Sequence, residues 1–224
     1  MTEPEFRFST SYGRVISLRS RQDRRERLLE NLGLMGFEPG DFSFKDAVPD
    51  EFHGGIGCAK SHCEVLVEFI LHRREEFLIV LEDDFEFRKS KSEVEKAVTL
   101  LCSRAPDWRV FLLSGSYVVK IPKFESAGCT ICQIFQSQTT SGYVVRRDFA
   151  LALLSCFLEA LDGLTKYRNI RPYNLVYARF AIDQQWKFLQ GKGGWYSSAP
   201  MLGAQSSSYS DIEKKTVDYN DFSA

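Results

Sequence analysis

The sequence predicts one α/β domain, with a mostly parallel central sheet flanked by helices. Short apolar runs alternate along the chain with segments of helical periodicity, an alternation typical of parallel α/β sheets. One run, residues 77–81 (Phe-Leu-Ile-Val-Leu), has the uninterrupted apolar character of a strand buried on both faces. The 224 residues are enough for a single domain with a substantial core, and no internal repeat divides them.

The first half of the chain contains three predicted strands and three predicted helices. In order they are a strand at 14–18, a helix at 23–35, a strand at 42–44, a helix at 57–74, a strand at 77–81 and a helix at 92–103. In the second helix Val65, Leu66, Phe69 and Ile70 recur at helical spacing, so we expect them in the core. Pro106 ends the third helix.

The second half continues the pattern and then becomes polar. We predict strands at 109–114 and 141–145, a hairpin of 117–121 with 130–135, and helices at 148–161 and 182–189. The domain is expected to span residues 1–212. The last residues, 213–224, have few apolar side chains and are predicted to form a mobile tail.

Three carboxylates stand at the carboxyl end of the predicted strand 77–81. Glu82, Asp83 and Asp84 would repel one another strongly unless something cationic lay between them. Open α/β sheets bind ligands at strand carboxyl ends, and a hard ion such as Mg²⁺ or Mn²⁺ prefers oxygen ligands and commonly binds phosphate as well. The pattern therefore indicates a metal site, and the alternative is an acidic loop that faces water.

Several short motifs occur in a fixed order along most of the chain. They are RVISLR at 14–19, DRR at 23–25, GGIGCAKSH at 54–62, LEDD at 81–84, TSGYVV at 140–145, Ile182-Asp183, Gln205 and SDI at 210–212. This order resembles glycosyltransferase family 25, the lipooligosaccharide and collagen galactosyltransferase type. That family shows a V-I-(N/S)-L strand followed by D-R-R, a G-x-I-G-C-x-x-S-H helix start and an L-E-D-D strand end. The resemblance spans roughly residues 14 to 212.

The resemblance implies a fold and an activity. The fold would be of the GT-A type, which is Rossmann-like. The activity would be metal-dependent transfer of a hexose from a UDP-sugar, UDP-galactose or UDP-glucose, to a hydroxyl of a glycan or glycoconjugate, with inversion. Asp84 is the expected direct ligand of Mn²⁺ or Mg²⁺, with Glu82 as a second ligand. Because all three histidines lie at or before His72, Gln205, Asp211 or a water molecule would have to supply the late ligand that many such folds take from a histidine.

The donor site implied by the same motifs draws on several segments. The expected donor-binding residues are Ser17, Leu18, Arg19, Arg24, Arg25, Gly57, Ser61, His62, Glu82, Asp83 and Gln205. A local basic cluster that would face a nucleotide phosphate or, alternatively, solvent is formed by Arg19, Arg21, Arg24, Arg25 and Arg27. N–H groups at the helix start near Gly57 would face anionic donor groups, and a histidine satisfied within the core is the alternative for His62.

One carboxylate late in the chain is the predicted catalytic base. Inversion in one displacement needs a base for the acceptor hydroxyl, and Asp183 matches the late Asp of the family. The alternative is a carboxylate that only stabilises a helix N-terminus. Trp186 and Trp195 would offer flat faces to a sugar ring or, alternatively, pack in the core.

Two other segments have a spacing that resembles binding motifs. Cys129-x-x-Cys132 together with Cys58 and His62 would form a four-ligand zinc site, with reduced packed thiols as the favoured alternative. The segment Gly55–Lys60 fails as a dinucleotide or phosphate loop, because Lys60 and Ala59 stand where glycines are needed.

Composition excludes other classes. A net charge of −1 provides no broad basic field, so we expect no nucleic-acid partner. No apolar run approaches the ~20 residues that cross a bilayer, and the first ten residues do not resemble a secretory signal. The expectation is a cytoplasmic protein without a transmembrane segment, with peripheral membrane contact left open. The alternative functions are a non-catalytic sugar-nucleotide-binding protein and another metal-dependent nucleotide enzyme such as a nucleotidyltransferase.

Overall fold

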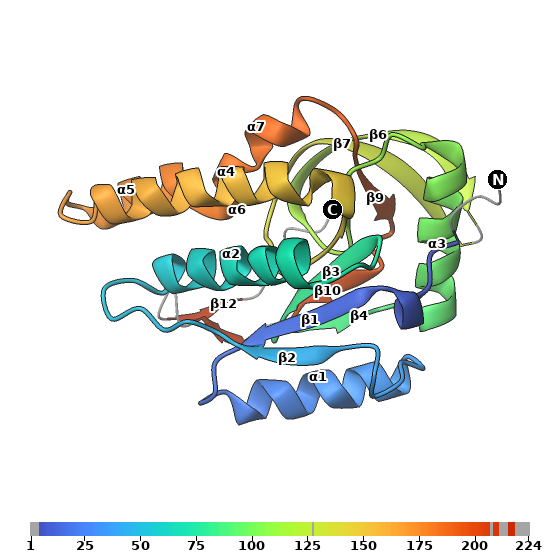
Figure 1. The fold of residues 1–224 in the computed structure, drawn as a ribbon, viewed down its shortest axis with the longest axis horizontal. Helices are drawn as coiled ribbons and strands as arrows, with labels where there is room; N and C mark the ends of the chain where they lie inside the picture. The colour runs from blue at the N-terminus through green and yellow to red at the C-terminus, as the bar shows by residue number, and fades with distance from the viewer. Residues whose placement is uncertain (1–4, 127, 207, 211–214, 218–224) are drawn as a thin grey trace.

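A computed structural model describes residues 5–126, 128–206, 208–210 and 215–217, and its centre is an eight-stranded sheet (Figure 1). In spatial order the strands are β2 (Ser43–Asp46), β1 (Tyr12–Ser17), β3 (Phe77–Glu82), β8 (Gly142–Arg146), β5 (Val110–Leu112), β9 (Trp195–Ala199), β7 (Cys129–Gln138) and β6 (Ser116–Ser126). Six of these eight strands run in one direction, and β8 and β7 run in the other. The predicted α/β class with a mostly parallel central sheet is therefore confirmed.

Helices cover both faces of the sheet. The core on one face includes side chains of α1 (Gln22–Leu34) and α3 (Lys91–Arg104), and the core on the other includes α2 (Gly54–His72) and α4 (Arg147–Lys166). On β3, Ile79 and Leu81 belong to the first core, whereas Leu78 and Val80 belong to the second. All four are fully buried. This explains why the strand is apolar at every position instead of at alternate ones.

Two helix predictions changed in the structure. Helix α2 begins at Gly54, one turn before the predicted Gly57, because His53 is its N-cap and the His53 Nδ1 accepts a hydrogen bond from the Gly55 N–H at 3.1 Å. The predicted helix 182–189 consists of two short helices, α6 (Ile182–Gln185) and α7 (Lys187–Gln190). The predicted hairpin is longer than expected, since its strands β6 and β7 together span Ser116 to Gln138.

Several elements were not predicted. They are η1 (Phe8–Thr10), the helix α5 (Tyr173–Phe180), the strand β9, the antiparallel pair β4 (Phe85–Phe87) and β10 (Gly203–Gln205), and the pair β11 (Ser208–Ser210) and β12 (Lys215–Val217). Apart from β12, the predicted mobile tail 213–224 lies outside the described residues.

The two tryptophans considered for sugar stacking belong to the core. Trp186 and Trp195 are both fully buried, with ring centroids 5.2 Å apart in an edge-to-face arrangement. Trp186 Nε1 also donates to the Ser137 carbonyl at 3.0 Å. Core packing was therefore the correct alternative, and neither ring is available to stack on a sugar.

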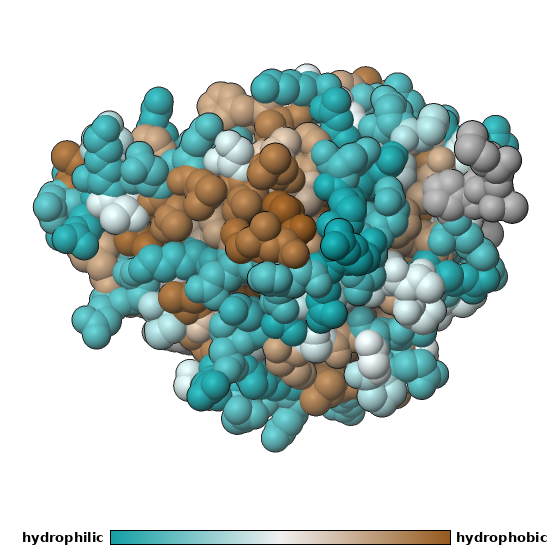
Figure 2. Space-filling view, viewed as in Figure 1, coloured by the Kyte–Doolittle hydropathy of each residue, from teal (hydrophilic) through white to brown (hydrophobic). Residues whose placement is uncertain are grey.

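Apolar side chains gather on the molecular surface over the region of α2 and α4 (Figure 2). Val67 and Leu71 on α2 and Leu151 and Leu158 on α4 are among the exposed large apolar residues. Within the described part of the chain, no helix has both the length and the apolar character needed to span a membrane. Peripheral membrane contact stays a prediction.

Candidate functional site

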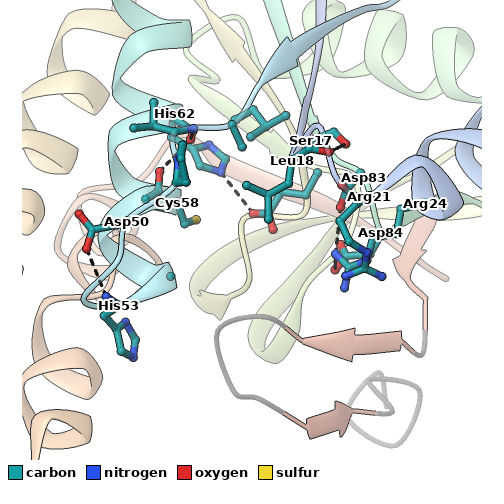
Figure 3. A pocket seen from close by; sticks show the side chains of 18 of the residues that line it. Ser17, Leu18, Arg21, Arg24, Asp50, His53, Cys58, His62, Asp83 and Asp84 are labelled. Carbon is teal, nitrogen blue, oxygen red and sulfur yellow. Dashed lines mark hydrogen bonds and ion pairs between the residues drawn. The ribbon is translucent and has the colours of Figure 1, made fainter.

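A cavity of about 310 Å³ opens at the carboxyl ends of the parallel strands β1 and β3 (Figure 3). Ser17 ends β1 and Leu18 follows it, and Glu82 ends β3 with Asp83 and Asp84 directly after it. The segment 47–53 and the first two turns of α2 line it as well. Arg21, Arg24, Asp83 and Asp84 gather at one end of the cavity in Figure 3, with Asp50 and His53 at the other. The location is the one expected for a ligand in an open α/β sheet.

Most of the predicted donor and metal residues meet in this cavity. The lining includes Ser17, Leu18, Arg24, Gly57, Ser61, His62, Glu82, Asp83, Asp84 and Gln205. Arg19 and Arg25 do not line it. Arg19 is exposed and pairs with Asp46 at 2.6 Å, and Arg25 binds Asp46 at 2.8 Å and the Ser17 hydroxyl at 3.0 Å. Arg25 therefore supports the end of β1 from behind the cavity.

Arg24 lies between two of the three carboxylates. Its Nη1 is 2.9 Å from Asp83 Oδ1 and 3.1 Å from Asp84 Oδ2, and all three side chains are almost fully buried. Arg24 comes from α1, so the cation that the acidic cluster requires is supplied from a different element of the chain. Burial nevertheless raises the pKa of Asp83, although Arg24 and Ser17 hydrogen-bond to it.

Asp84 is the carboxylate that is least satisfied. Its Oδ2 also accepts a hydrogen bond from Gln205 Nε2 at 3.1 Å, whereas Oδ1 is buried with no hydrogen-bond partner among the described residues. Burial, followed by the negative charge of Glu82, raises the pKa of Asp84 to about 7. A buried carboxylate oxygen without a partner is costly, and a divalent cation would satisfy it. The side chain predicted to bind a metal therefore fits that role.

Glu82 belongs to a different set of contacts. His62 Nε2 lies 3.2 Å from Glu82 Oε1, His62 Nδ1 lies 3.0 Å from the Tyr143 hydroxyl, and Thr140 donates to Glu82 Oε1 at 2.7 Å. His62 is fully buried. Both ring nitrogens of His62 thus have hydrogen-bond partners within the protein, as expected for a histidine that belongs to the core. The contact with His62 also orients Glu82 at the cavity.

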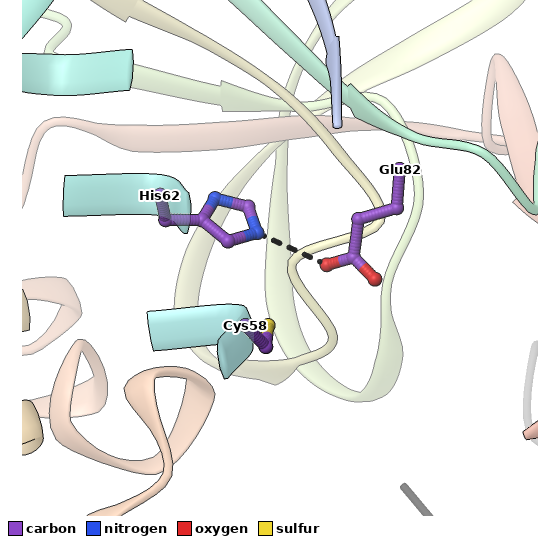
Figure 4. Close-up of side chains that lie close together, drawn as sticks. All are labelled: Cys58, His62 and Glu82. Atoms are coloured by element: carbon purple, nitrogen blue, oxygen red, sulfur yellow. Dashed lines mark hydrogen bonds and ion pairs between the residues drawn. The ribbon is translucent and has the colours of Figure 1, made fainter. Parts of the chain in front are cut away.

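Cys58, His62 and Glu82 offer one sulfur, one nitrogen and one oxygen within 4.8 Å of one another (Figure 4). Burial raises the pKa of the Cys58 thiol well above its ordinary value, so the thiol is protonated. Sulfur and imidazole ligands suit Zn²⁺ better than Mg²⁺ or Mn²⁺. The cavity wall thus contains a second group that could hold a metal, one that does not include Asp84.

The four-ligand zinc site is not formed. Among the described residues, Cys58, His62 and Glu82 are the only metal-ligand group of three or more, and none of the six cysteines forms a disulfide. Cys129 packs in the core on the opposite face of the sheet from Cys58. The two cysteine-bearing pairs therefore cannot share an ion. Asp211, considered as a late metal ligand, lies outside the described residues.

A chain of hydrogen bonds links Asp183 to Asp84. Asp183 Oδ2 accepts from the Thr139 N–H at 3.1 Å, Thr139 Oγ1 donates to Gln205 Oε1 at 3.2 Å, and Gln205 donates to Asp84. Asp183 is not in the lining of the cavity itself. Burial raises its pKa although the Thr139 bond and the charge of Lys187 oppose that shift.

The backbone of Thr139 is strained. Its φ of 77° is in the left-handed region, which β-branched residues rarely adopt. Such strain persists only where surrounding contacts hold it, and it is concentrated at functional sites. Here the bonds to Asp183 and Gln205 hold the residue at the junction between β7 and β8.

The segment after β2 is held against α2 by two small residues. A Cβ at Gly57 would overlap the carbonyl oxygen of Val48, so only glycine allows this approach. Ser61 Oγ accepts from the Val48 N–H at 2.8 Å and donates to the Gly57 carbonyl at 2.7 Å. The Ser61 hydroxyl is thus used to position the cavity wall.

Other lining residues were not predicted. They include Asp50 and His53 in the first cavity, with Thr139 in the adjoining hydrogen-bond chain. Arg21 also lines the cavity, and it is a member of the predicted basic cluster. The His53 ring packs near Tyr173 and Tyr177, with centroids 4.8 and 4.9 Å apart. The sequence held no signal for these contacts, because α5 was itself unpredicted.

Comparison with known proteins gives no family assignment. No protein-family model matches the chain, and no curated protein matches it. Three solved structures overlap most of it at low identity. A197 from STIV has 14% identity and a TM-score of 0.48, over 98% of this chain and 97% of that one. A glycosyltransferase involved in the glycosylation of the major capsid of PBCV-1 has 11% identity and a TM-score of 0.40, over 91% of this chain and 96% of that one. Mouse xyloside xylosyltransferase 1 has 9% identity and a TM-score of 0.39, over 80% of this chain and 81% of that one.

Proposed function

We propose that this chain is a metal-dependent glycosyltransferase that moves a hexose from a UDP-sugar to a hydroxyl of a glycan or glycoconjugate, with inversion. The observation that carries the proposal is the buried Oδ1 of Asp84, which has no hydrogen-bond partner among the described residues and lies in the wall of the cavity at the end of β3. This oxygen supports a cation site at the carboxyl end of β3, and open α/β sheets bind their ligands at the carboxyl ends of the strands. The family resemblance favours UDP-galactose or UDP-glucose as the donor.

The metal proposal names Asp84 as the direct ligand and Glu82 as the second. When bound, Mn²⁺ or Mg²⁺ would neutralise charge on the diphosphate leaving group. Two features of the metal-ligand side chains support this assignment. The side chains are carboxylates, which hard divalent ions prefer, and Asp84 has an oxygen that the described protein leaves without a partner.

The donor proposal uses the rest of the lining. Arg21 and Arg24 line the cavity beside the carboxylates and would attract the diphosphate. Gly54 and Gly57 bring the first turn of α2 into the wall, where the positive end of the helix dipole favours anions. Ser17 and Leu18, at the end of β1, also line the cavity. The volume of about 310 Å³ is at the small end of the range for small-molecule sites.

Asp183 is proposed as the base. The acceptor oxygen would form a bond to the anomeric carbon as its proton passes to the Asp183 carboxylate. The bond from that carbon to the β-phosphate oxygen would break at the same time, and UDP would leave with the electron pair. The hydrogen bond from the Thr139 N–H holds the carboxylate in one orientation, and its raised pKa makes it a stronger base than an exposed aspartate.

Release of UDP tests the proposal. The chain is incubated with UDP-galactose or UDP-glucose and Mn²⁺, with and without neutral and anionic glycosides as acceptors, and UDP is quantified. We expect UDP release that acceptors accelerate and that EDTA abolishes. UDP binding with no release would indicate a non-catalytic sugar-nucleotide-binding protein, and pyrophosphate release from nucleoside triphosphates would indicate a nucleotidyltransferase. Either result would contradict the proposal.

A further inference from the structure

A second cavity of about 280 Å³ shares a wall with the first. Gln205 lines both, and Thr139 lines the second. The remaining wall comes from the residues after β4, from the start of β6 and from the segment that leads into β10. A molecule in the second cavity would therefore be separated from the first by the Gln205 side chain.

The two cavities differ in charge. The first has five carboxylates in its lining, namely Asp50, Glu51, Glu82, Asp83 and Asp84. The lining of the second, as far as the structure describes it, has no carboxylate and three cations, Arg88, Lys89 and Lys120. Lys89 forms an ion pair with Glu93 at 3.3 Å. The net positive lining of the second cavity suits a negatively charged ligand.

Lys120 lies beside an irregularity of β6. The register between β6 and β7 shifts on both sides of Val119. Such bulges change the direction in which a side chain points. Val119 and Ile121, which flank Lys120, are more than half exposed, whereas Lys120 is partly buried and lines the cavity. The structure records no ion pair for Lys120 with any described residue.

The wall between the two cavities is connected by hydrogen bonds to the proposed metal ligand, Asp84, and to the proposed base, Asp183. Gln205 donates to Asp84 in the first cavity, and Thr139 donates its N–H to Asp183. The Thr139 hydroxyl donates to Gln205. A ligand against Thr139 in the second cavity would adjoin the residue that orients Asp183, and a donor in the first would adjoin Asp84.

We propose that the second cavity binds the acceptor, and that the acceptor carries a phosphate or carboxylate group bound by Lys120 and Arg88. This inference deepens the proposed glycosyltransferase function and rests on it. A two-substrate transfer needs two adjoining sites, and Gln205 and Thr139 form their common wall. An anionic acceptor would give Lys120 the ion pair that no described residue provides, and a neutral sugar would not, so the lining favours anionic sugars.

Calorimetry on the full chain tests the inference with three probes that differ in charge: glucose 6-phosphate, glucuronate and glucose. We expect the two anionic sugars to bind more tightly than glucose, with an affinity that falls as salt is added. Comparison of the phosphate and carboxylate probes identifies which anion the cavity prefers. Lys120→Gln should weaken anionic binding by about fivefold, the scale of one partly screened charge contact, and Arg88→Gln should act in the same direction.

Lys123→Gln is the matched control, because Lys123 lies on the same strand, is exposed and does not line the cavity. It should leave anionic binding unchanged. Equal affinity for all three sugars, or equal losses in the Lys120 and Lys123 variants, would overturn the inference. So would competition between the anionic sugars and saturating UDP with Mn²⁺, since that would place the anion in the first cavity. Anion binding through Lys120 without any UDP binding would instead remove the proposed function and leave an anion site.

Discussion

Arg24 Nη1 lies 3.1 Å from Asp84 Oδ2, and these two residues are 60 positions apart in the sequence. The same nitrogen also contacts Asp83 at 2.9 Å. Repulsion among the three carboxylates at the end of β3 is therefore reduced by a side chain of α1 before any metal binds. Asp84 Oδ1 still has no partner in the described protein, so Arg24 compensates the acidic cluster only in part.

Arg24→Met should destabilise the fold. It leaves two buried carboxylates without their cation, and loss of one partner of a buried ion pair costs about 3–5 kcal/mol. The loss should be smaller at pH 5 than at pH 8, because Asp84, with a pKa of about 7, is already protonated at pH 5. Denaturant unfolding at both pH values measures the difference. An unchanged free energy of unfolding at pH 8 would contradict this account of the cluster.

Asp84→Asn should remove the part of UDP binding that depends on a divalent ion while the fold stays intact. The amide cannot replace the carboxylate charge at a hard cation. Calorimetry of UDP with Mn²⁺ or with EDTA measures the effect, and Asp162→Asn, at an exposed position on α4, is the control. Equal UDP affinity in EDTA, or in the Asp84 variant, would exclude Asp84 as the metal ligand.

Asp183→Asn separates catalysis from structure. As a base, Asp183 should be dispensable for donor affinity, but its loss should lower transfer by ~10²-fold or more. If the residue only supports α6 and Thr139, stability should fall by roughly 1 kcal/mol with turnover of the folded enzyme near normal. Measurements of UDP affinity, turnover and thermal unfolding on one preparation distinguish the two roles. Retention of configuration in the product, observed by NMR, would remove the need for this base.

The pH dependence of turnover should reflect Asp183. A base works when deprotonated, so kcat/KM should fall as pH decreases through its pKa, which burial raises above the ordinary aspartate value. Asp183→Asn should lose this acid limb. The free energy of unfolding depends on pH with the opposite sign, because the pKa of Asp183 is higher in the native state than in the unfolded state. The stabilisation that Asp183 contributes is therefore fully present below the unfolded pKa of 3.8 and is lost as pH rises through the native pKa. An acid limb that persists unchanged in the variant would assign it to another group.

Gly57→Ala should disturb the first cavity. The added Cβ overlaps the Val48 carbonyl, so the segment that forms one wall must move, and overpacking of this kind costs about 1–3 kcal/mol. We expect weaker UDP binding together with lower stability. Gly33→Ala is the control, since a Cβ there meets nothing within 4 Å on the exposed side of α1. It should stabilise the chain by roughly 0.5–1 kcal/mol and leave UDP binding unchanged.

Local sequence patterns predicted most of the elements near the first cavity. The apolar run of β3 and the helical spacing in α2 are signals carried by neighbouring residues, so β1, β3, α1 and α2 were found with small boundary errors. Strand β9 was missed because Ser197 and Ser198 are polar yet fully buried beside Trp195. Its place in the centre of the sheet comes from pairing with β5 and β7, which no local pattern records.

The sequence by itself determined that three carboxylates follow a buried strand, because strand formation and side-chain chemistry are both local properties. The family resemblance grouped Ser17, Gly57 and Gln205 as donor-binding residues, and in the structure all three line one cavity. Only the tertiary structure decided that Arg24 is the cation between Asp83 and Asp84. It also decided that Thr139 and Gln205 connect Asp183 with Asp84 through hydrogen bonds. The basic cavity that Thr139 and Gln205 line is a further result of the tertiary structure. These contacts join segments that are distant in the chain, and packing of the helices and loops around the sheet sets their geometry.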